Sequence, residues 1–233
     1  MALNKFNLKI KKKILPFKKT IHVDADKSIS IRSFLIAAIS QNLSIANNVL
    51  ESEDVMSTIN CLKKLGVKIK KIKSKKYLIY GNGLGSLFIK KNSQLNFGNS
   101  GTLARLLIGI LSTTPNLTVN LKGDRSLNKR NMSSLIKLMR RFGAEFFPKR
   151  KKNFPVKLVS SRIPIGIKYD AGVSAQLKSA VMLAGLNSYG NTKIIEVEKS
   201  RDHTENMLVK NKFAINIKTV SYTHLRAHET YDH

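Results

Sequence analysis

Three segments of the chain share one pattern: a short polar loop leads into a helix-length run that is apolar on nearly every side. The segments are DADKSISIRSFLIAAIS from Asp24, FGNSGTLARLLIGILS from Phe97 and DAGVSAQLKSAVMLAG from Asp170. A helix that is apolar all round has to be buried. Aligning Ser28, Ser100 and Ser174 gives spacings of about 72 and 74 residues, the size of a compact α/β unit. The pattern predicts three related units with buried helices.

Each unit contains a second segment with apolar residues at helical spacing, opened by a capping-type residue. These segments are 52–69, 131–146 and 200–217. Short alternating or β-branched runs predict the strands. They lie around 17–23, 44–49, 67–72, 77–80, 87–90, 117–122, 144–147, 156–159, 166–169 and 192–197. The order β-α-β-α-β-β in each unit predicts the α/β (α+β) class and a pseudo-threefold domain over 21–219.

The glycine-rich run GNGLGS at 81–86 has the outline of a dinucleotide-binding loop. That fingerprint needs a following helix to receive the pyrophosphate. The run is followed by LFIKK, which is strand-like. We therefore interpret it as a hairpin turn.

The charge of the chain narrows the choice of partners. Of 233 residues, 42% are hydrophobic and 24% charged, and the net charge is +28. The basic runs at 9–19, 68–76 and 148–157 are scattered and rich in Lys, and aromatic residues make up only 7%. A nucleic-acid-binding protein is the alternative class, but no recognition motif is present. The charge favours small anionic substrates, and nucleic acid is not expected as a partner.

The cysteine content and the lengths of the apolar runs indicate in which cellular compartment the protein is expected. Cys61 is the only cysteine, so neither a disulfide framework nor a thiolate metal site is expected. No apolar run reaches membrane-spanning length, and the first residues lack the pattern of a signal peptide. We expect a cytoplasmic location, no membrane partner, and no metal or organic cofactor.

The polar loops before the three apolar helices carry the candidate chemistry. Helix N-termini present free N–H groups and a positive dipole end, which bind phosphate or carboxylate. Equivalent loops of a pseudo-threefold domain lie at the same end, so the three loops would converge on one anion. The side chains that they offer are Lys27, Ser28 and Arg32, then Asn99, Ser100, Gly101 and Thr102, then Ser174, Ala175 and Gln176. The competing interpretation is a structural domain whose loops are ordinary helix caps, with Arg105 a solvated or paired helix residue.

The chain resembles the 5-enolpyruvylshikimate-3-phosphate (EPSP) synthase family. DKSISIR, GNSGT, GDRSLNKR, VSAQ and SRDHTENML occur in the family's order between about residues 17 and 219. The resemblance implies an inverted α/β barrel arrangement of six units, three per domain, with the active site between the domains. It also implies that residues 1–20 pair with a second domain, and that the full-length protein is a monomer.

The resemblance implies roles residue by residue. Lys27 would be catalytic and contact phosphoenolpyruvate. The other phosphoenolpyruvate ligands would be Asn99, Gly101, Thr102 and Arg130. The shikimate 3-phosphate ligands would be Ser28, Arg32, Ser174, Ala175, Gln176, Ser200 and Arg201. Ala175 replaces a frequent Ser, which weakens one expected phosphate contact.

The implied reaction transfers the enolpyruvyl group of phosphoenolpyruvate to the 5-hydroxyl of shikimate 3-phosphate and releases phosphate. This is a step of the shikimate pathway toward chorismate and the aromatic amino acids. A family member should be nearly twice as long, so the chain is expected to be an N-terminal fragment that is inactive alone. The sister transferase that acts on UDP-N-acetylglucosamine is the alternative, but it typically has Lys-Asn where this chain has Lys27-Ser28.

The last stretch, VSYTHLRAHETYDH at 220–233, matches nothing before it. His224 and His228 are four residues apart and precede Glu229, a spacing that could suggest a metal site. We interpret the stretch instead as a non-native tail translated from a sequencing-library adapter, and exclude it from the fold.

Overall fold

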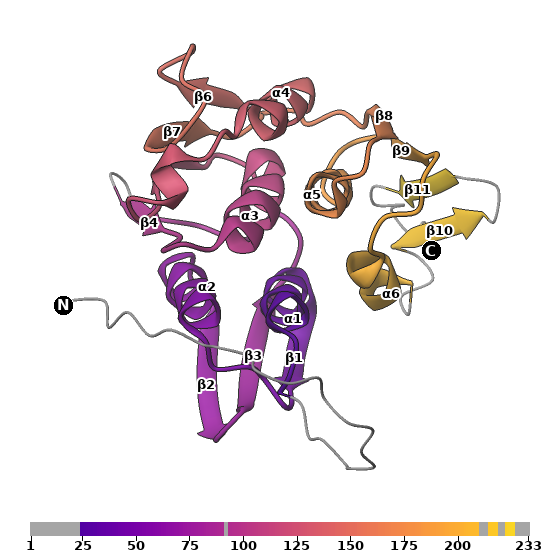
Figure 1. Ribbon diagram of the computed structural model, residues 1–233. Helices are drawn as coiled ribbons and strands as arrows, with labels where there is room; N and C mark the ends of the chain where they lie inside the picture. Colours follow the sequence, from indigo (N-terminus) through magenta and orange to yellow (C-terminus); the bar gives the residue numbers. More distant parts are fainter. Residues whose placement is uncertain (1–23, 91–92, 210–213, 219–221, 227–233) are drawn as a thin grey trace, which may run out of the picture.

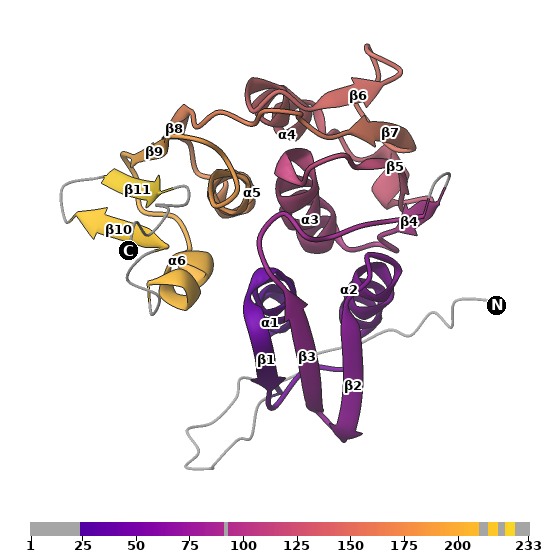
Figure 2. The same cartoon turned by 180° about the vertical axis from the view of Figure 1, so that it is seen from behind.

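Three units of sheet and helix surround a common centre in this computed structural model, which describes residues 24–90, 93–209, 214–218 and 222–226. Helices α1, α3 and α5 gather in the centre, and the sheets lie on the outside (Figure 1). The view from behind shows the same arrangement (Figure 2). The buried helices predicted from the sequence are therefore confirmed.

The first unit runs through α1 (Lys27–Ile39), β1 (Gln41–Ala46), α2 (Glu53–Lys64), β2 (Lys68–Lys73) and β3 (Lys76–Asn82). Its strands form an antiparallel sheet in the order β1-β3-β2. The strand predicted at 17–23 lies outside the described residues.

The second unit contains β4 (Gln94–Asn96), α3 (Gly101–Thr113), β5 (Thr118–Lys122), α4 (Ser133–Arg141), β6 (Glu145–Phe147) and β7 (Val156–Val159). A 3₁₀ turn, η1 (Leu127–Lys129), precedes α4. The sheet order is β4-β5-β7-β6, and only β4 and β5 are parallel.

The third unit repeats this design. It contains β8 (Lys168–Ala171), α5 (Ala175–Gly185), β9 (Asn191–Glu196), α6 (His203–Leu208), β10 (Ile215–Lys218) and β11 (Tyr222–Arg226). Its sheet order, β8-β9-β11-β10, with β8 parallel to β9, matches the second unit strand for strand. The first unit shows the last three strands of the same order. The predicted β-α-β-α-β-β repeat is confirmed in units two and three.

Two glycines explain how α2 ends and how closely α3 packs against α5. Gly66 follows α2 with a φ of +86°, the left-handed conformation that favours Gly after a helix. Gly109 lies in α3, and a Cβ there would come within 2.4 Å of the Ala180 carbonyl oxygen of α5. The absence of a side chain at this position lets the two central helices touch backbone to backbone.

Two local predictions were wrong, and one strand was missed. The segment 200–217 is not one helix, since α6 ends at Leu208 and β10 begins at Ile215. No strand forms at 87–90, so the glycine-rich run at 81–86 makes a turn without a hairpin. The short strand β4 was not expected at all.

The tail is only partly described. β11, which lies within 220–233, pairs with β9 and β10, whereas residues 220–221 and 227–233, including His228 and Glu229, lie outside the described residues. Residues 1–20 also lie outside them. The adapter origin of the tail and the role of the opening segment stay predictions.

Within the described ranges, no helix is both long and apolar enough to span a bilayer.

Candidate functional site

The three central helices begin with the same capping geometry. Asp26, Ser100 and Ser174 are the N-caps of α1, α3 and α5. Each side chain accepts a hydrogen bond from the backbone N–H three residues on, over 2.7, 3.2 and 3.4 Å. The caps are spaced by 74 residues in both intervals. The alignment of Ser28 with the two serines was therefore wrong, because the capping residue of the first unit is an aspartate.

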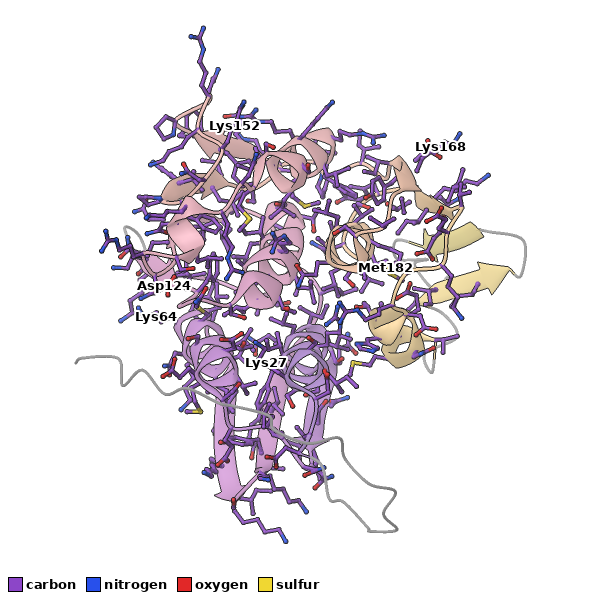
Figure 3. The ribbon with its side chains drawn as sticks, in the orientation of Figure 1. Lys27, Lys64, Asp124, Lys152, Lys168 and Met182 are labelled. Atoms are coloured by element: carbon purple, nitrogen blue, oxygen red, sulfur yellow. The ribbon has the colours of Figure 1, made fainter. Side chains whose placement is uncertain are left out.

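Lys27 is the first residue of α1, and its ammonium group is paired with a carboxylate. Nζ lies 3.0 Å from Asp54 Oδ2, with about half of the lysine side chain exposed. Asp54 comes from the first turn of α2, and Figure 3 shows Lys27 between α1 and α2. The pair fixes the direction of the ammonium group while leaving it in contact with solvent.

Arg32 is buried, with 4% of its surface exposed, and it links three elements. Nε donates to Thr204 Oγ1 (2.8 Å) in α6, a terminal nitrogen to the Ser28 carbonyl (3.0 Å), and the other to Ser179 Oγ (3.4 Å) in α5. Burial lowers the pKa of Arg32, an effect that nearby Glu205 and Asp26 oppose. The guanidinium has five N–H donors, and these three bonds use three of them.

We call the N-terminal end of each central helix its mouth, the first mouth being that of α1. The mouth of α3 holds two guanidinium groups. Arg130 donates to Asn99 Oδ1 (2.8 Å), and Arg105 reaches back to the Gly101 carbonyl (3.1 Å). Burial, together with the charge of Arg130, lowers the pKa of Arg105. Neither group forms an ion pair with a carboxylate within the described parts of the chain. Two cations without a carboxylate partner among the described residues make this mouth a candidate anion site.

Gly101 keeps this mouth open. A Cβ at this position would lie 2.8 Å from a terminal nitrogen of Arg105 and 3.1 Å from one of Arg130. Arg105 was not predicted as a site residue. The signal that could have found it is its position four residues after Gly101, which returns its side chain to the start of the helix.

The mouths of α3 and α5 are joined directly. Gln176 Nε2 donates to Thr102 Oγ1 over 2.9 Å. Ser174 is occupied as the cap, and Ala175 follows it as the first residue of α5. Of the predicted ligands on this helix, Gln176 therefore takes part in the junction, whereas Ser174 offers its remaining hydrogen-bonding capacity and Ala175 its backbone N–H.

Ser200 and Arg201 lie on the loop between β9 and α6. The Ser200 N–H donates to Glu196 Oε1 (2.7 Å). Its Oγ is buried and has no partner among the described residues. Arg201 is exposed, and its charge is close enough to lower the pKa of Arg32. The structure thus places this loop beside the first mouth.

No group of three His, Cys, Asp or Glu side chains that could hold a metal ion occurs among the residues for which the structure gives a placement. Of the predicted site residues, hydrogen bonds join Gln176 to Thr102 across the starts of α5 and α3, Arg130 to Asn99, and Arg32 to α5 and α6, whereas Lys27 contacts Asp54 of α2. Such an arrangement can bind an anion and orient it, with charge placed where negative charge develops.

Comparison with known proteins agrees with these motifs. A sequence model described as EPSP synthase (3-phosphoshikimate 1-carboxyvinyltransferase) matches residues 11–228. The 3-phosphoshikimate 1-carboxyvinyltransferases of Syntrophomonas wolfei and Oceanobacillus iheyensis are 40% and 41% identical, over 86% and 88% of this chain. The solved EPSP synthase of Acinetobacter baumannii is 35% identical over 90% of this chain, with a TM-score of 0.81.

The chain spans about half the length of these relatives: 46% and 47% of the two sequences and 47% of the solved chain. The match nevertheless runs through all three units and all five motifs. The chain belongs to the EPSP synthase family.

Proposed function

We propose that this chain supplies the shikimate 3-phosphate-binding half of a 3-phosphoshikimate 1-carboxyvinyltransferase. The whole protein would transfer the enolpyruvyl group of phosphoenolpyruvate to the 5-hydroxyl of shikimate 3-phosphate and release phosphate. The observation that carries the proposal is the junction of the helix mouths, where Gln176 meets Thr102 and the guanidinium groups of Arg105 and Arg130 have no carboxylate partner among the described residues.

The two substrates would occupy different sides of this junction. Shikimate 3-phosphate would lie toward α1 and α5, against Ser28, Arg32, Ser174, Gln176 and the loop of Ser200 and Arg201. Phosphoenolpyruvate would lie at the mouth of α3, where Arg130, Asn99 and Thr102 would receive it. Lys27, held by Asp54, would stand between them and stabilise the charge that develops as the hydroxyl adds and phosphate leaves.

Acid–base groups must lie within hydrogen-bond reach of the reacting atoms. The described residues of the junction offer cations, amides and hydroxyls but few free carboxylates, since Asp54, Glu196 and Glu205 are all paired with lysines. We therefore expect the portion of the relatives that this chain does not span to supply proton transfer, and this chain to bind but not turn over. The proposed substrates are small anions in the cytoplasm, and nucleic acid is not proposed as a partner.

Calorimetric titration of the 233-residue chain with shikimate 3-phosphate tests the proposal. Arg201→Ala is the first variant, because Arg201 is exposed and forms no hydrogen bond or ion pair with the part of the chain that the structure describes. Arg32→Ala is the second, although the buried network of Arg32 makes it a test of stability too. Saturable binding that Arg201→Ala weakens about tenfold would support the proposal.

Two results would contradict the proposal. One is no binding by a chain shown to be folded. The other is salt-dependent binding to any DNA that shikimate 3-phosphate does not displace, which would favour the nucleic-acid alternative.

A further inference from the structure

Lys178 is a buried lysine near the start of the central helix α5. Only 3% of its side chain is exposed. Lysine is almost never fully buried unless it is paired, and a cation near a helix N-terminus opposes the helix dipole. A lysine in this position therefore needs partners, and the structure supplies them.

Two carboxylates from different elements hold Lys178. Nζ lies 2.9 Å from both carboxylate oxygens of Glu196, the last residue of β9. It lies 2.5 Å from Oε1 of Glu205 in α6. Burial would lower the pKa of Lys178, but the hydrogen bonds with Glu196 and Glu205 outweigh it and raise that pKa above its ordinary value. The two carboxylates therefore favour the charged form of Lys178 between α5, β9 and α6.

The triad of Lys178, Glu196 and Glu205 controls both ends of the loop that carries Ser200 and Arg201. Glu196 precedes the loop and also accepts the Ser200 N–H over 2.7 Å. Glu205 follows the loop, directly after Thr204, whose Oγ1 accepts a hydrogen bond from Arg32 and donates one to Ser179 (2.8 Å). The same lysine thus contacts the residue before this loop and the helix turn that holds Arg32.

We propose that Lys178 is a positioning residue, which through Glu196 and Glu205 holds Ser200, Arg201 and Thr204 in the geometry that the anionic substrate requires. This inference rests on the proposed function for the identity of the ligand, shikimate 3-phosphate. The effect of Lys178 on the loop at 197–202 does not depend on which ligand binds. Removing one partner from a buried ion pair leaves an uncompensated charge, so without Lys178 the two carboxylates would repel one another and the loop would leave α5.

Three variants of the 233-residue chain test the role of Lys178. Lys178→Met keeps the length of the side chain and removes its charge, and Lys178→Arg keeps the charge. Met182→Ala is the control for stability, because Met182 is a fully buried, uncharged residue one turn further along α5 (Figure 3) that forms none of the hydrogen bonds or ion pairs of the triad. The measurements are amide hydrogen exchange over 197–202, the Kd for shikimate 3-phosphate, and the urea midpoint of unfolding.

Lys178→Met should raise the exchange rate of the Ser200 amide and the Kd about tenfold each, and Lys178→Arg should recover part of both. Met182→Ala should lower the urea midpoint. Amide exchange over 197–202 should change no more in this variant than exchange of the neighbouring segments does. Equal loop exchange in Lys178→Met and Met182→Ala at matched stability would overturn the proposal.

Two further outcomes have defined meanings. If Lys178→Met does not fold, Glu205→Gln replaces it, since this variant removes one charge of the triad and keeps the side-chain volume. Faster exchange of the Ser200 amide in Glu205→Gln would then support the proposal, and unchanged exchange would overturn it. If the unmodified chain does not bind shikimate 3-phosphate, the proposed function fails, while the exchange comparison still decides whether Lys178 holds the loop.

Discussion

Gln176 and Thr102 occupy the same position in two different units and touch each other. Each is the second residue of its central helix, 74 residues apart along the chain, and a 2.9 Å hydrogen bond joins Nε2 of the glutamine to Oγ1 of the threonine. Ser28 holds the same position in α1. The repeat thus brings two of the three equivalent residues into direct contact, where α3 and α5 begin.

The bond between Gln176 and Thr102 should be measurable as a coupling free energy. In a double-mutant cycle of Gln176→Met and Thr102→Val, we expect the two substitutions to be non-additive by about 1 kcal/mol in the free energy of unfolding. Urea titration of the four proteins gives the value. Strict additivity would mean that the α3 and α5 mouths are not joined by this bond in solution.

The capping geometry predicts that Asp26 and Ser28, both at the start of α1, differ in their contribution to stability. Asp26→Ala, Ser100→Ala and Ser174→Ala should each lower the free energy of unfolding by about 1 kcal/mol, because each removes an observed cap. Ser28→Ala is the matched control, since Ser28 lies inside the first turn and does not cap. A loss in Ser28→Ala as large as in Asp26→Ala, measured by urea unfolding, would restore the alignment that the sequence suggested.

Gly101→Ala should weaken anion binding at the mouth of α3 more than it weakens the fold. The added Cβ would push against the ends of Arg105 and Arg130, which are flexible enough to move but would then leave their present positions. We expect a rise of about tenfold in the Kd for phosphoenolpyruvate, with little change in the urea midpoint. Gly172→Ala is the control, because a Cβ there meets nothing within 4 Å. Equal Kd values for the two variants would contradict the assignment.

Glu51 predicts a pH dependence of stability in the acid range. The Lys71 ammonium and the Tyr77 hydroxyl donate to its carboxylate and lower its pKa from 4.5 to about 2. The folded state therefore prefers the charged form, and the stabilisation is present above about pH 4.5 and lost as the pH falls toward 2. Glu51→Gln should lose less stability over this interval than the unmodified chain. Parallel curves of urea midpoint against pH for the two proteins would refute the prediction.

Much of the fold could be predicted because its central helices are apolar on every side. The segments around α1, α3 and α5 stand out for that reason, and the regular spacing of their polar starts gave the repeat. The errors have local causes. β4 has three residues, too few to show an alternating pattern. The segment 200–217 joins a six-residue helix to a strand, and so has no single period.

The candidate site was predictable in its residue types but not in its contacts. Ser and Asp are about equally good caps, so the sequence alone could not decide whether Asp26 or Ser28 starts α1. Nor could it reveal that Arg32 is buried against Thr204, 172 residues away, or that Lys178 finds its two carboxylates in other elements. These contacts depend on how the units pack against one another, and a local sequence pattern does not contain that information.

The aspartate cap of α1 makes the charge at the start of this helix differ from that at the starts of α3 and α5. The caps of α3 and α5 are neutral hydroxyls, whereas Asp26 brings a carboxylate to the start of the first helix. The helix dipole attracts an anion at all three ends, but only at the α1 end does a capping carboxylate oppose that attraction, next to the Lys27 and Arg32 cations that favour it. The three ends therefore differ in charge although the architecture around them repeats, so a ligand whose groups carry unequal charge has one favoured orientation among them.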